Sequence, residues 1–197
     1  MKVLVVAPHP DDETLCCGGI IMNFIEKGDK VKVVIVTDGR YGAPSEELRG
    51  TEELVRIRRG EALRVFKILG VDDFEFLNFE DTKVSQRRKE VEEKLSRILH
   101  NYNPDIVFSP SPFDRHIDHL EIGKIMLRLF PNSYFYVIWG DQKVGEVVKF
   151  EIKNKKENKL RALEEYKSQI GGIKKDLPFE KLAGDYEIFY KISDNSV

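Results

Sequence analysis

Short apolar runs alternate along this chain with longer segments whose apolar residues recur at helical spacing. Five runs are short enough to be strands: residues 2–7, 31–36, 74–79, 106–109 and 134–139. The helical segments are residues 15–26, 45–69, 84–101, 120–130 and 156–169, and weaker strand signals occur at 149–152 and 187–192. Strands joined through helices form right-handed parallel units. The pattern predicts an α/β fold: a Rossmann-like, doubly wound, mostly parallel sheet of about five to six strands with helices on both faces.

Length and composition narrow the class of protein further. At 197 residues the chain is expected to form a single domain, residues 1–197. Positive and negative residues nearly balance, giving a formal net charge of −2, so no general field favours a nucleic-acid partner. No apolar run approaches the length needed for membrane insertion, and the neighbouring Cys16 and Cys17 cannot make a disulfide framework. We therefore expect a cytoplasmic protein with no nucleic acid and no membrane insertion, and a homo-oligomer is left open.

Polar residues gather directly after the predicted strands. The clusters are residues 9–13, 37–42, 80–81 and 114–119. Because parallel strands end at the same edge of a sheet, these clusters are expected to share that edge. In a doubly wound sheet the strand order reverses between the first and fourth strands. The sequence therefore predicts that the first and last clusters flank one crevice.

Three of the chain's four histidines lie in those two clusters, beside carboxylates. Crowded carboxylates repel one another, and a bound cation relieves that repulsion. Two histidines and a carboxylate around an open position match a catalytic zinc site, in which water takes the fourth place. Fe2+ or Mn2+ would suit a similar set of ligands. We expect Zn2+ as the cofactor, with Fe2+ or Mn2+ as alternatives.

The two clusters also carry a resemblance to a known family. Pro8-His-Pro-Asp-Asp-Glu13, followed about a hundred residues later by His116-Ile-Asp-His119, resembles the LmbE/PIG-L family of zinc-dependent N-deacetylases. Related patterns occur at Thr37–Gly39, Arg58–Glu61, Leu69–Val71, Phe76–Asp81 and Tyr166–Gln169, so the resemblance covers nearly the whole chain. One departure is Ile117, where many members of the family have proline.

The resemblance implies roles for six residues. The metal ligands would be His9, Asp12 and His119. Asp11 would be the general base that takes a proton from zinc-bound water, which suits a carboxylate beside a metal. His116 would stand as imidazolium beside the developing oxyanion or the leaving amine, with Asp118 orienting it and raising its pKa.

Three residues are expected to contact the substrate. By the resemblance, Arg58 and Asp81 would line the pocket and bind sugar hydroxyls, although Arg58 could instead pair with Glu53 or Glu61 on a helix surface. Asp114-Arg115 resembles the subgroup that acts on small glycosides, and Arg115 would meet a negative charge of the substrate or form a local salt bridge. Glu13 would either support a metal-ligating histidine or cap the following helix.

These expectations describe a hydrolase that removes the N-acetyl group from an N-acetylglucosamine-type sugar or small glycoside, by attack of metal-activated water on the amide carbonyl. Its partner would be that small molecule. One alternative is a receiver-like phosphoacceptor domain, which has an acidic pair after the first strand; Asp81 could then be phosphorylated, but Lys143 comes late for the required lysine. The other alternative is a metal-containing sugar-binding module without turnover.

Overall fold

A sheet flanked by helices forms the centre of the computed structural model, which describes residues 1–43, 45–141, 144–178 and 182–192. The strands are β1 (Lys2–Ala7), β2 (Lys30–Thr37), β3 (Asp73–Phe79), β4 (Ile106–Pro110), β5 (Tyr134–Tyr136), β6 (Glu146–Glu151) and β7 (Tyr186–Lys191). The helices are α1 (Asp12–Glu26), α2 (Glu52–Leu69), α3 (Arg88–Tyr102), α4 (Ile117–Leu129), α5 (Lys156–Glu164) and α6 (Ile170–Asp176), with a short 3₁₀ turn at Lys153–Lys155. Lys143, the candidate lysine of the receiver-like alternative, lies outside the described residues.

The described strands form one seven-stranded sheet in the order β3-β2-β1-β4-β5-β7-β6. Strands β1 to β5 are parallel, and β7 is antiparallel to both β5 and β6. The predicted fold class and the reversal between β1 and β4 are confirmed. The strand count of five to six is too low, because both weak signals near the C-terminus form strands, which pair antiparallel at the edge of the sheet although α5 and α6 lie between them in the chain.

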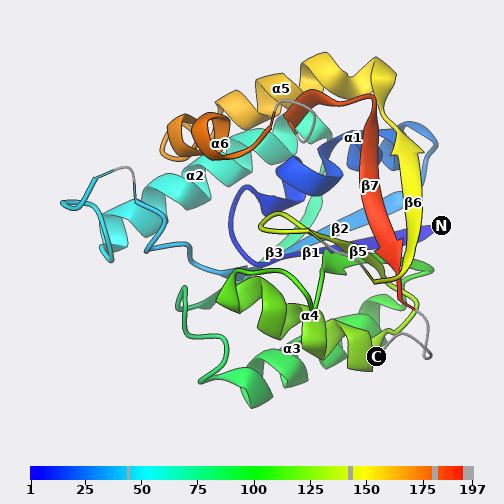
Figure 1. Cartoon of the computed structure of the whole chain (residues 1–197), viewed down its shortest axis with the longest axis horizontal. Helices are drawn as coiled ribbons and strands as arrows, with labels where there is room; N and C mark the ends of the chain where they lie inside the picture. Colours follow the sequence, from blue (N-terminus) through cyan, green and yellow to red (C-terminus); the bar gives the residue numbers. More distant parts are fainter. Residues whose placement is uncertain (44, 142–143, 179–181, 193–197) are drawn as a thin grey trace.

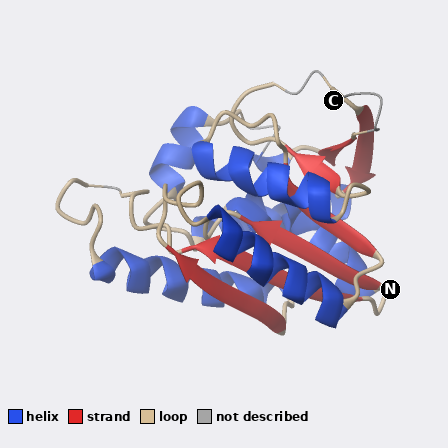
Figure 2. Ribbon diagram, turned by 90° about the horizontal axis from the view of Figure 1, so that it is seen from below, coloured by secondary structure: helices blue, strands red, loops and turns tan. Residues whose placement is uncertain are grey.

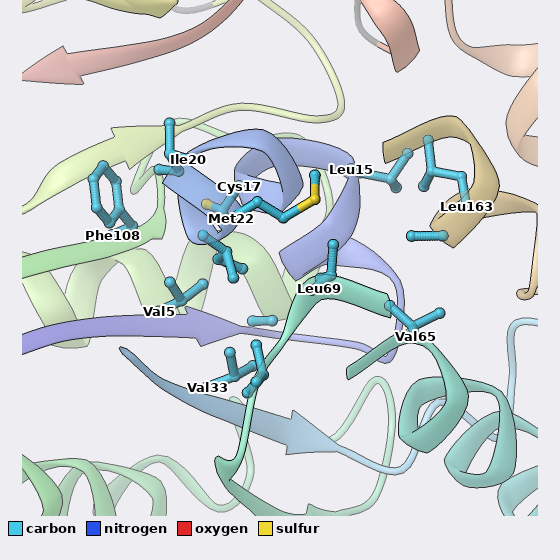
Figure 3. Packing of buried hydrophobic residues seen from close by; sticks show 14 of the residues in the cluster. Val5, Leu15, Cys17, Ile20, Met22, Val33, Val65, Leu69, Phe108 and Leu163 are labelled. Atoms are coloured by element: carbon cyan, nitrogen blue, oxygen red, sulfur yellow. The ribbon is translucent and has the colours of Figure 1, made fainter. Parts of the chain in front are cut away.

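Two apolar clusters hold helices to the two faces of this sheet. Successive residues of β1 alternate between them: Val3 and Val5 face one cluster, and Leu4 and Val6 the other. The first cluster lies under α1, α2 and α5, and the second under α3 and α4, as the layers in Figures 1 and 2 show. Figure 3 shows part of the first cluster, with sheet residues such as Val33 beneath the helices. Among the described residues, no helix is long and apolar enough to cross a membrane.

The predicted helices 45–69 and 156–169 differ most from those in the structure. The first of these begins at Glu52 and not at residue 45, because Thr51 caps it: the Thr51 side chain accepts the Leu54 N–H at 3.2 Å. It ends as predicted at Gly70, in the left-handed conformation that favours glycine. The predicted helix 156–169 breaks after Glu164, and residues 165–169 form a turn between α5 and α6. That turn contains the Tyr166–Gln169 pattern.

Gly123 brings α4 close to the loop that leads into the second histidine cluster. A Cβ at Gly123 would lie 2.4 Å from both the Pro112 nitrogen and the Ser111 carbonyl carbon, which are backbone atoms that cannot rotate away. We expect Gly123→Ala to lower the free energy of unfolding by about 1–3 kcal/mol. The matched change Gly60→Ala, in the open part of α2, should raise it by about 0.5–1 kcal/mol. Urea denaturation measures both, and equal effects would contradict the close approach.

Candidate active site

Two loops at the carboxyl edge of the sheet bring the histidine clusters together. The first joins β1 to α1 and carries His9, Asp11 and Asp12; the second joins β4 to α4 and carries His116, the N-cap residue of α4. The two strands are neighbours in the sheet, so the loops face each other although they are more than a hundred residues apart in sequence. The structure thus brings the two clusters into contact, as predicted.

Three potential ligand atoms lie close together where the two clusters meet. His9 Nδ1 is 3.1 Å from Asp12 Oδ2 and 3.2 Å from His119 Nε2, and His119 Nε2 is 3.1 Å from Asp12 Oδ2. Ligands about 2.0–2.1 Å from a tetrahedral zinc ion are roughly 3.3 Å apart, so the triangle has nearly the required size. All three residues are buried. Their chemistry and spacing fit a metal with one face left open for water or substrate.

Carboxylates behind the two histidines complete the arrangement. His9 Nε2 lies 3.1 Å from Asp81 Oδ1 and 3.3 Å from Asp118 Oδ2, while His119 Nδ1 lies 3.4 Å from Asp114 Oδ2. The last contact is long, and His119 Nδ1 has no closer partner among the described residues. Such outer carboxylates fix the tautomer and ring orientation of metal-binding histidines.

The carboxylates also create a strongly negative field at the imidazole rings. Burial lowers the pKa of His119, but Asp12 and then Asp114 reverse the effect and raise it to about 9. Burial likewise opposes a charge on His9, whose pKa is nonetheless well above the usual value because of Asp118, Asp12 and Asp81. A field that favours protons on these nitrogens also favours a cation between them.

Two other groups of donor atoms lie within 4.8 Å of one another: His9 with His116 and His119, and His9 with Asp81 and Asp118. The second group uses Nε2 of His9, and a neutral imidazole accepts on one nitrogen while it donates from the other. If Nδ1 binds a metal, Nε2 carries the ring proton and donates a hydrogen bond to Asp81 or Asp118. A metal bound by His9, Asp12 and His119 is therefore compatible with hydrogen bonds from His9 to Asp81 or Asp118. A neutral His9 cannot bind a second metal through Nε2 at the same time.

Asp81 and Asp118 consequently have different surroundings from those predicted. Asp81 was expected to bind sugar hydroxyls, but its oxygens face His9 and accept the Tyr41 N–H at 2.9 Å. Asp118 was expected to orient the His116 ring, but its carboxylate accepts the N–H groups of Thr82 and Val84 and lies against His9. Both carboxylates are directed into the protein behind His9.

Among the described residues, no carboxylate is hydrogen-bonded to the His116 ring. Its Nδ1 lies 3.3 Å from the Asp118 N–H and accepts from it, so the ring proton is on Nε2. The predicted raised pKa is wrong: burial first, then the neighbouring His9 and His119 charges, lower the pKa of His116. The ring is half-buried, and its Nε2–H is a neutral donor available to an oxygen or nitrogen of a ligand.

Asp11 has an unusual backbone conformation for a residue with a side chain. Its φ is 127°, a region that L-residues rarely adopt, and such conformations cost about 1–3 kcal/mol. Burial raises the pKa of Asp11 to about 7, an effect that Arg58 opposes and Asp12 reinforces. Asp11 thus stands beside the ligand triangle as a carboxylate able to accept a proton near neutral pH.

Arg58 is buried, so the predicted alternative of a surface ion pair is wrong, while its predicted contact with substrate stays a prediction. Its Nη2 donates to the Pro10 carbonyl at 2.6 Å and to Asp11 Oδ2 at 3.1 Å, and its Nη1 donates to the Gly39 carbonyl at 2.8 Å. Gly39 has a φ of 68°, and a Cβ there would lie 2.6 Å from Nη1. Arg58 therefore holds the loop of Asp11, and its buried Nε has no hydrogen-bond partner among the described residues.

Glu13 makes no hydrogen bond to a histidine among the described residues, and its carboxylate accepts the N–H of Asp11, the N-cap residue of α1, in agreement with the predicted capping alternative. Its Oε1 accepts from the hydroxyls of Thr14, at 2.5 Å, and Tyr166, and its Oε2 accepts the Asp11 N–H at 3.1 Å. Burial raises its pKa, and these three donors act in the opposite direction. The sequence motif marked Tyr166 as part of a pattern, but nothing in the sequence links it to Glu13, 153 residues away.

A mainly apolar cavity of about 240 Å³ lies between α1, the segment after β5 and β7. Its described lining residues are Leu15, Cys16, Val137, Ile138, Gly140, Asp141, Leu177, Tyr186, Glu187, Ile188 and Tyr190. The cavity borders the site, because Ile138 donates its N–H to Asp114 and Gly140 packs against the Arg115 side chain. Arg115 itself is exposed, and its predicted contact with substrate stays a prediction.

Comparison with known proteins gives the fold and site a family. Residues 4–130 match the family described as PIG-L, GlcNAc-PI de-N-acetylase. The chain is 35% identical over 125 residues to diacetylchitobiose deacetylase of Thermococcus kodakarensis, covering 62% of this chain and 46% of that protein. It is 28% identical over 183 residues to a probable N-acetyl-alpha-D-glucosaminyl L-malate deacetylase 2 of Bacillus anthracis, covering 85% and 81%. It thus spans less than half of the first relative and most of the second.

Solved structures agree with the fold. The N,N'-diacetylchitobiose deacetylase of Pyrococcus horikoshii, in complex with an inhibitor, superposes with a TM-score of 0.79 at 29% identity, covering 95% of this chain and 82% of that chain. A 4-carboxy-2-hydroxymuconate hydratase of Pseudomonas putida reaches 0.72 at 21% identity, covering 85% and 79%, which is a likeness of fold alone.

Fold and site together define an α/β protein with a histidine–aspartate centre at the switch point of its sheet. The match over residues 4–130 makes the assignment specific: the chain belongs to the PIG-L family. The resemblance predicted from the two histidine motifs is confirmed.

Proposed function

We propose that this protein is a metal-dependent hydrolase that removes the N-acetyl group from an N-acetylglucosamine-type sugar or small glycoside. One observation carries the proposal: a chain of the PIG-L family holds His9 Nδ1, Asp12 Oδ2 and His119 Nε2 within 3.2 Å of one another, next to Asp11. His9, Asp12 and His119 would hold the metal. Zn2+ suits two imidazoles and one carboxylate, and Fe2+ or Mn2+ are the alternatives.

The reaction needs a proton acceptor, a proton donor and a stabilised oxyanion. A metal bound by the triangle would supply Lewis acidity and make a water molecule more acidic. Asp11 would accept a proton from the attacking water, and His116 Nε2–H would donate a hydrogen bond to the carbonyl oxygen as it becomes negative. The water oxygen joins the acetyl carbon, the C–N bond breaks, and the proton held by Asp11 passes to the amine nitrogen. The products are acetate and a free amino sugar.

The names of the relatives guide the choice of substrate. They include deacetylases of diacetylchitobiose, of N-acetylglucosaminyl malate, of 2'-N-acetylparomamine and of an inositol glycoside. All contain an acetylated amino sugar joined to a different second group. We propose a small molecule of this class for the present chain. Assaying such a panel for released acetate identifies the second group, and no acetate from any compound would contradict the proposal.

Removing the metal should abolish the activity. Lewis-acid stabilisation is worth several kcal/mol, so treatment with a chelator is expected to lower acetate release by more than about 1,000-fold. Adding Zn2+, Fe2+ or Mn2+ back in parallel, with elemental analysis of each sample, shows which ion restores it. Full activity after complete removal would contradict a metal-dependent mechanism.

The two alternative functions gain no support from the structure. Asp81, the candidate phosphoacceptor, is buried against His9 and the Tyr41 N–H. A sugar-binding module would have no use for a strained carboxylate such as Asp11 beside the ligand triangle. Sugar binding without acetate release would nevertheless favour the binding module and contradict turnover.

A further inference from the structure

The turn between α5 and α6 reaches the site from outside the matched region. We propose that Tyr166, Ser168 and Gln169 form a positioning device that holds Asp11 in its unusual conformation from two sides. The inference rests on the proposed role of Asp11 as proton acceptor. The turn lies beyond residues 4–130, the part that matches the family, so a C-terminal segment would complete the site.

One side of the device acts on the backbone of Asp11. The Tyr166 hydroxyl donates to Glu13 Oε1, and Glu13 Oε2 accepts the Asp11 N–H at 3.1 Å. Tyr166 and Glu13 are both fully buried. Because a φ of 127° is costly for aspartate, Asp11 keeps it only if its surroundings supply compensating contacts. The Glu13 carboxylate, oriented by Tyr166, supplies one of them.

The other side acts on the carboxylate of Asp11. Glu61 accepts from Ser168 N at 2.8 Å and Ser168 Oγ at 2.7 Å, which ties the turn to α2 one helical turn after Arg58. The Gln169 amide then donates to the Gly42 carbonyl at 2.5 Å.

Gly42 in turn confines Arg58. A Cβ at Gly42 would lie 2.5 Å from Arg58 Nη1, so the backbone of Gly42 lies directly against the guanidinium. The Nη2 of the same guanidinium donates to the Pro10 carbonyl and to Asp11 Oδ2. Gln169 therefore helps to position the Asp11 carboxylate indirectly: it holds Gly42, Gly42 confines Arg58, and Arg58 donates to Asp11.

Packing alone does not account for these residues. A phenylalanine would fill the volume of Tyr166, and an apolar side chain at position 13 would avoid burying a carboxylate, which is costly unless it is paired. The polar chain from Tyr166 through Glu13 ends at the N–H of Asp11. We infer that these polar contacts serve to hold Asp11 in its conformation.

The test removes the Tyr166 hydroxyl and follows two readouts. In Tyr166→Phe we expect kcat to fall about 10- to 100-fold, as for other supporting contacts of metal sites, with KM changed less than about twofold and zinc content unchanged. In the metal-free protein, hydrogen exchange of the Asp11 amide should become at least about tenfold faster, because its acceptor is less well held.

Tyr102→Phe is the matched control, because the Tyr102 hydroxyl also donates a hydrogen bond, in its case to the Lys30 carbonyl at the opposite edge of the sheet. The inference is overturned if Tyr166→Phe lowers kcat no more than Tyr102→Phe does, or if exchange at Asp11 does not change. If Tyr166→Phe does not fold, Gln169→Met carries the same test, with an expected loss in kcat of about 3- to 10-fold. A wild-type protein without deacetylase activity would refute the proposed function, and hydrogen exchange would still decide the inference.

Discussion

Asp11→Asn should retain the metal and lose nearly all deacetylation, with kcat about 100- to 10,000-fold lower. Asparagine has the same shape, tolerates positive φ better than most residues, and can still accept from Arg58 through its amide oxygen. It cannot, however, take a proton from water. Acetate release measures kcat, and elemental analysis of the same sample measures the metal.

The neighbouring change Asp12→Asn provides the contrast. Asp12 lies between His9 and His119, which hold its pKa well below the usual range, and a neutral amide there weakens a cation site. We expect Asp12→Asn to lose both the metal and the activity. Full activity of Asp11→Asn would remove its role as base. If Asp11→Asn loses the metal and Asp12→Asn keeps it, Asp11 is the metal ligand and Asp12 is the base.

The fold was predictable because its signals are local. Buried parallel strands such as β1 read as continuous apolar runs, and Gly70 marks the end of α2 in the sequence. The errors come where one contact decides a boundary: the Thr51 cap starts α2, and the turn at Tyr166 interrupts the predicted last helix. The signals of β6 and β7 are weak in the sequence because alternate residues of these strands are exposed, which shortens the apolar runs.

The site was predictable only in part, for a related reason. His9, Asp12 and His119 lie in dense motifs at strand ends, and the topology alone brings those ends together. The surroundings of Arg58, Asp81 and Asp118 depend on which partners are present after folding, and that information is spread over the chain. Asp114 had a usable signal, because it lies two residues before His116 in the same acidic cluster. For Tyr166 the only signal in the sequence was its place in the Tyr166–Gln169 pattern.

Lys159→Met should be the most destabilising substitution considered, at about 3–5 kcal/mol. Lys159 is buried, and its Nζ donates to Glu187 Oε1 at 2.7 Å and to the Leu15 carbonyl at 2.8 Å. Glu187 in turn accepts the N–H groups of Gly19 at 2.8 Å and Ile20 at 2.9 Å. The pair thus ties α5 and β7 to the middle of α1. Without Lys159, the buried carboxylate of Glu187 loses its counterion.

The surface pair of Lys155 and Glu26 provides the matched control, with the same residue types 2.8 Å apart. Glu26 is largely exposed, so Lys155→Met should cost no more than about 1 kcal/mol. Adding Glu187→Gln to Lys159→Met should recover part of the loss, because no unpaired charge is then buried. Chemical denaturation of the four proteins measures these differences. If Lys159→Met and Lys155→Met cost the same, the ion pair does not hold α1, and the helix that begins at Asp12 must be anchored by packing alone.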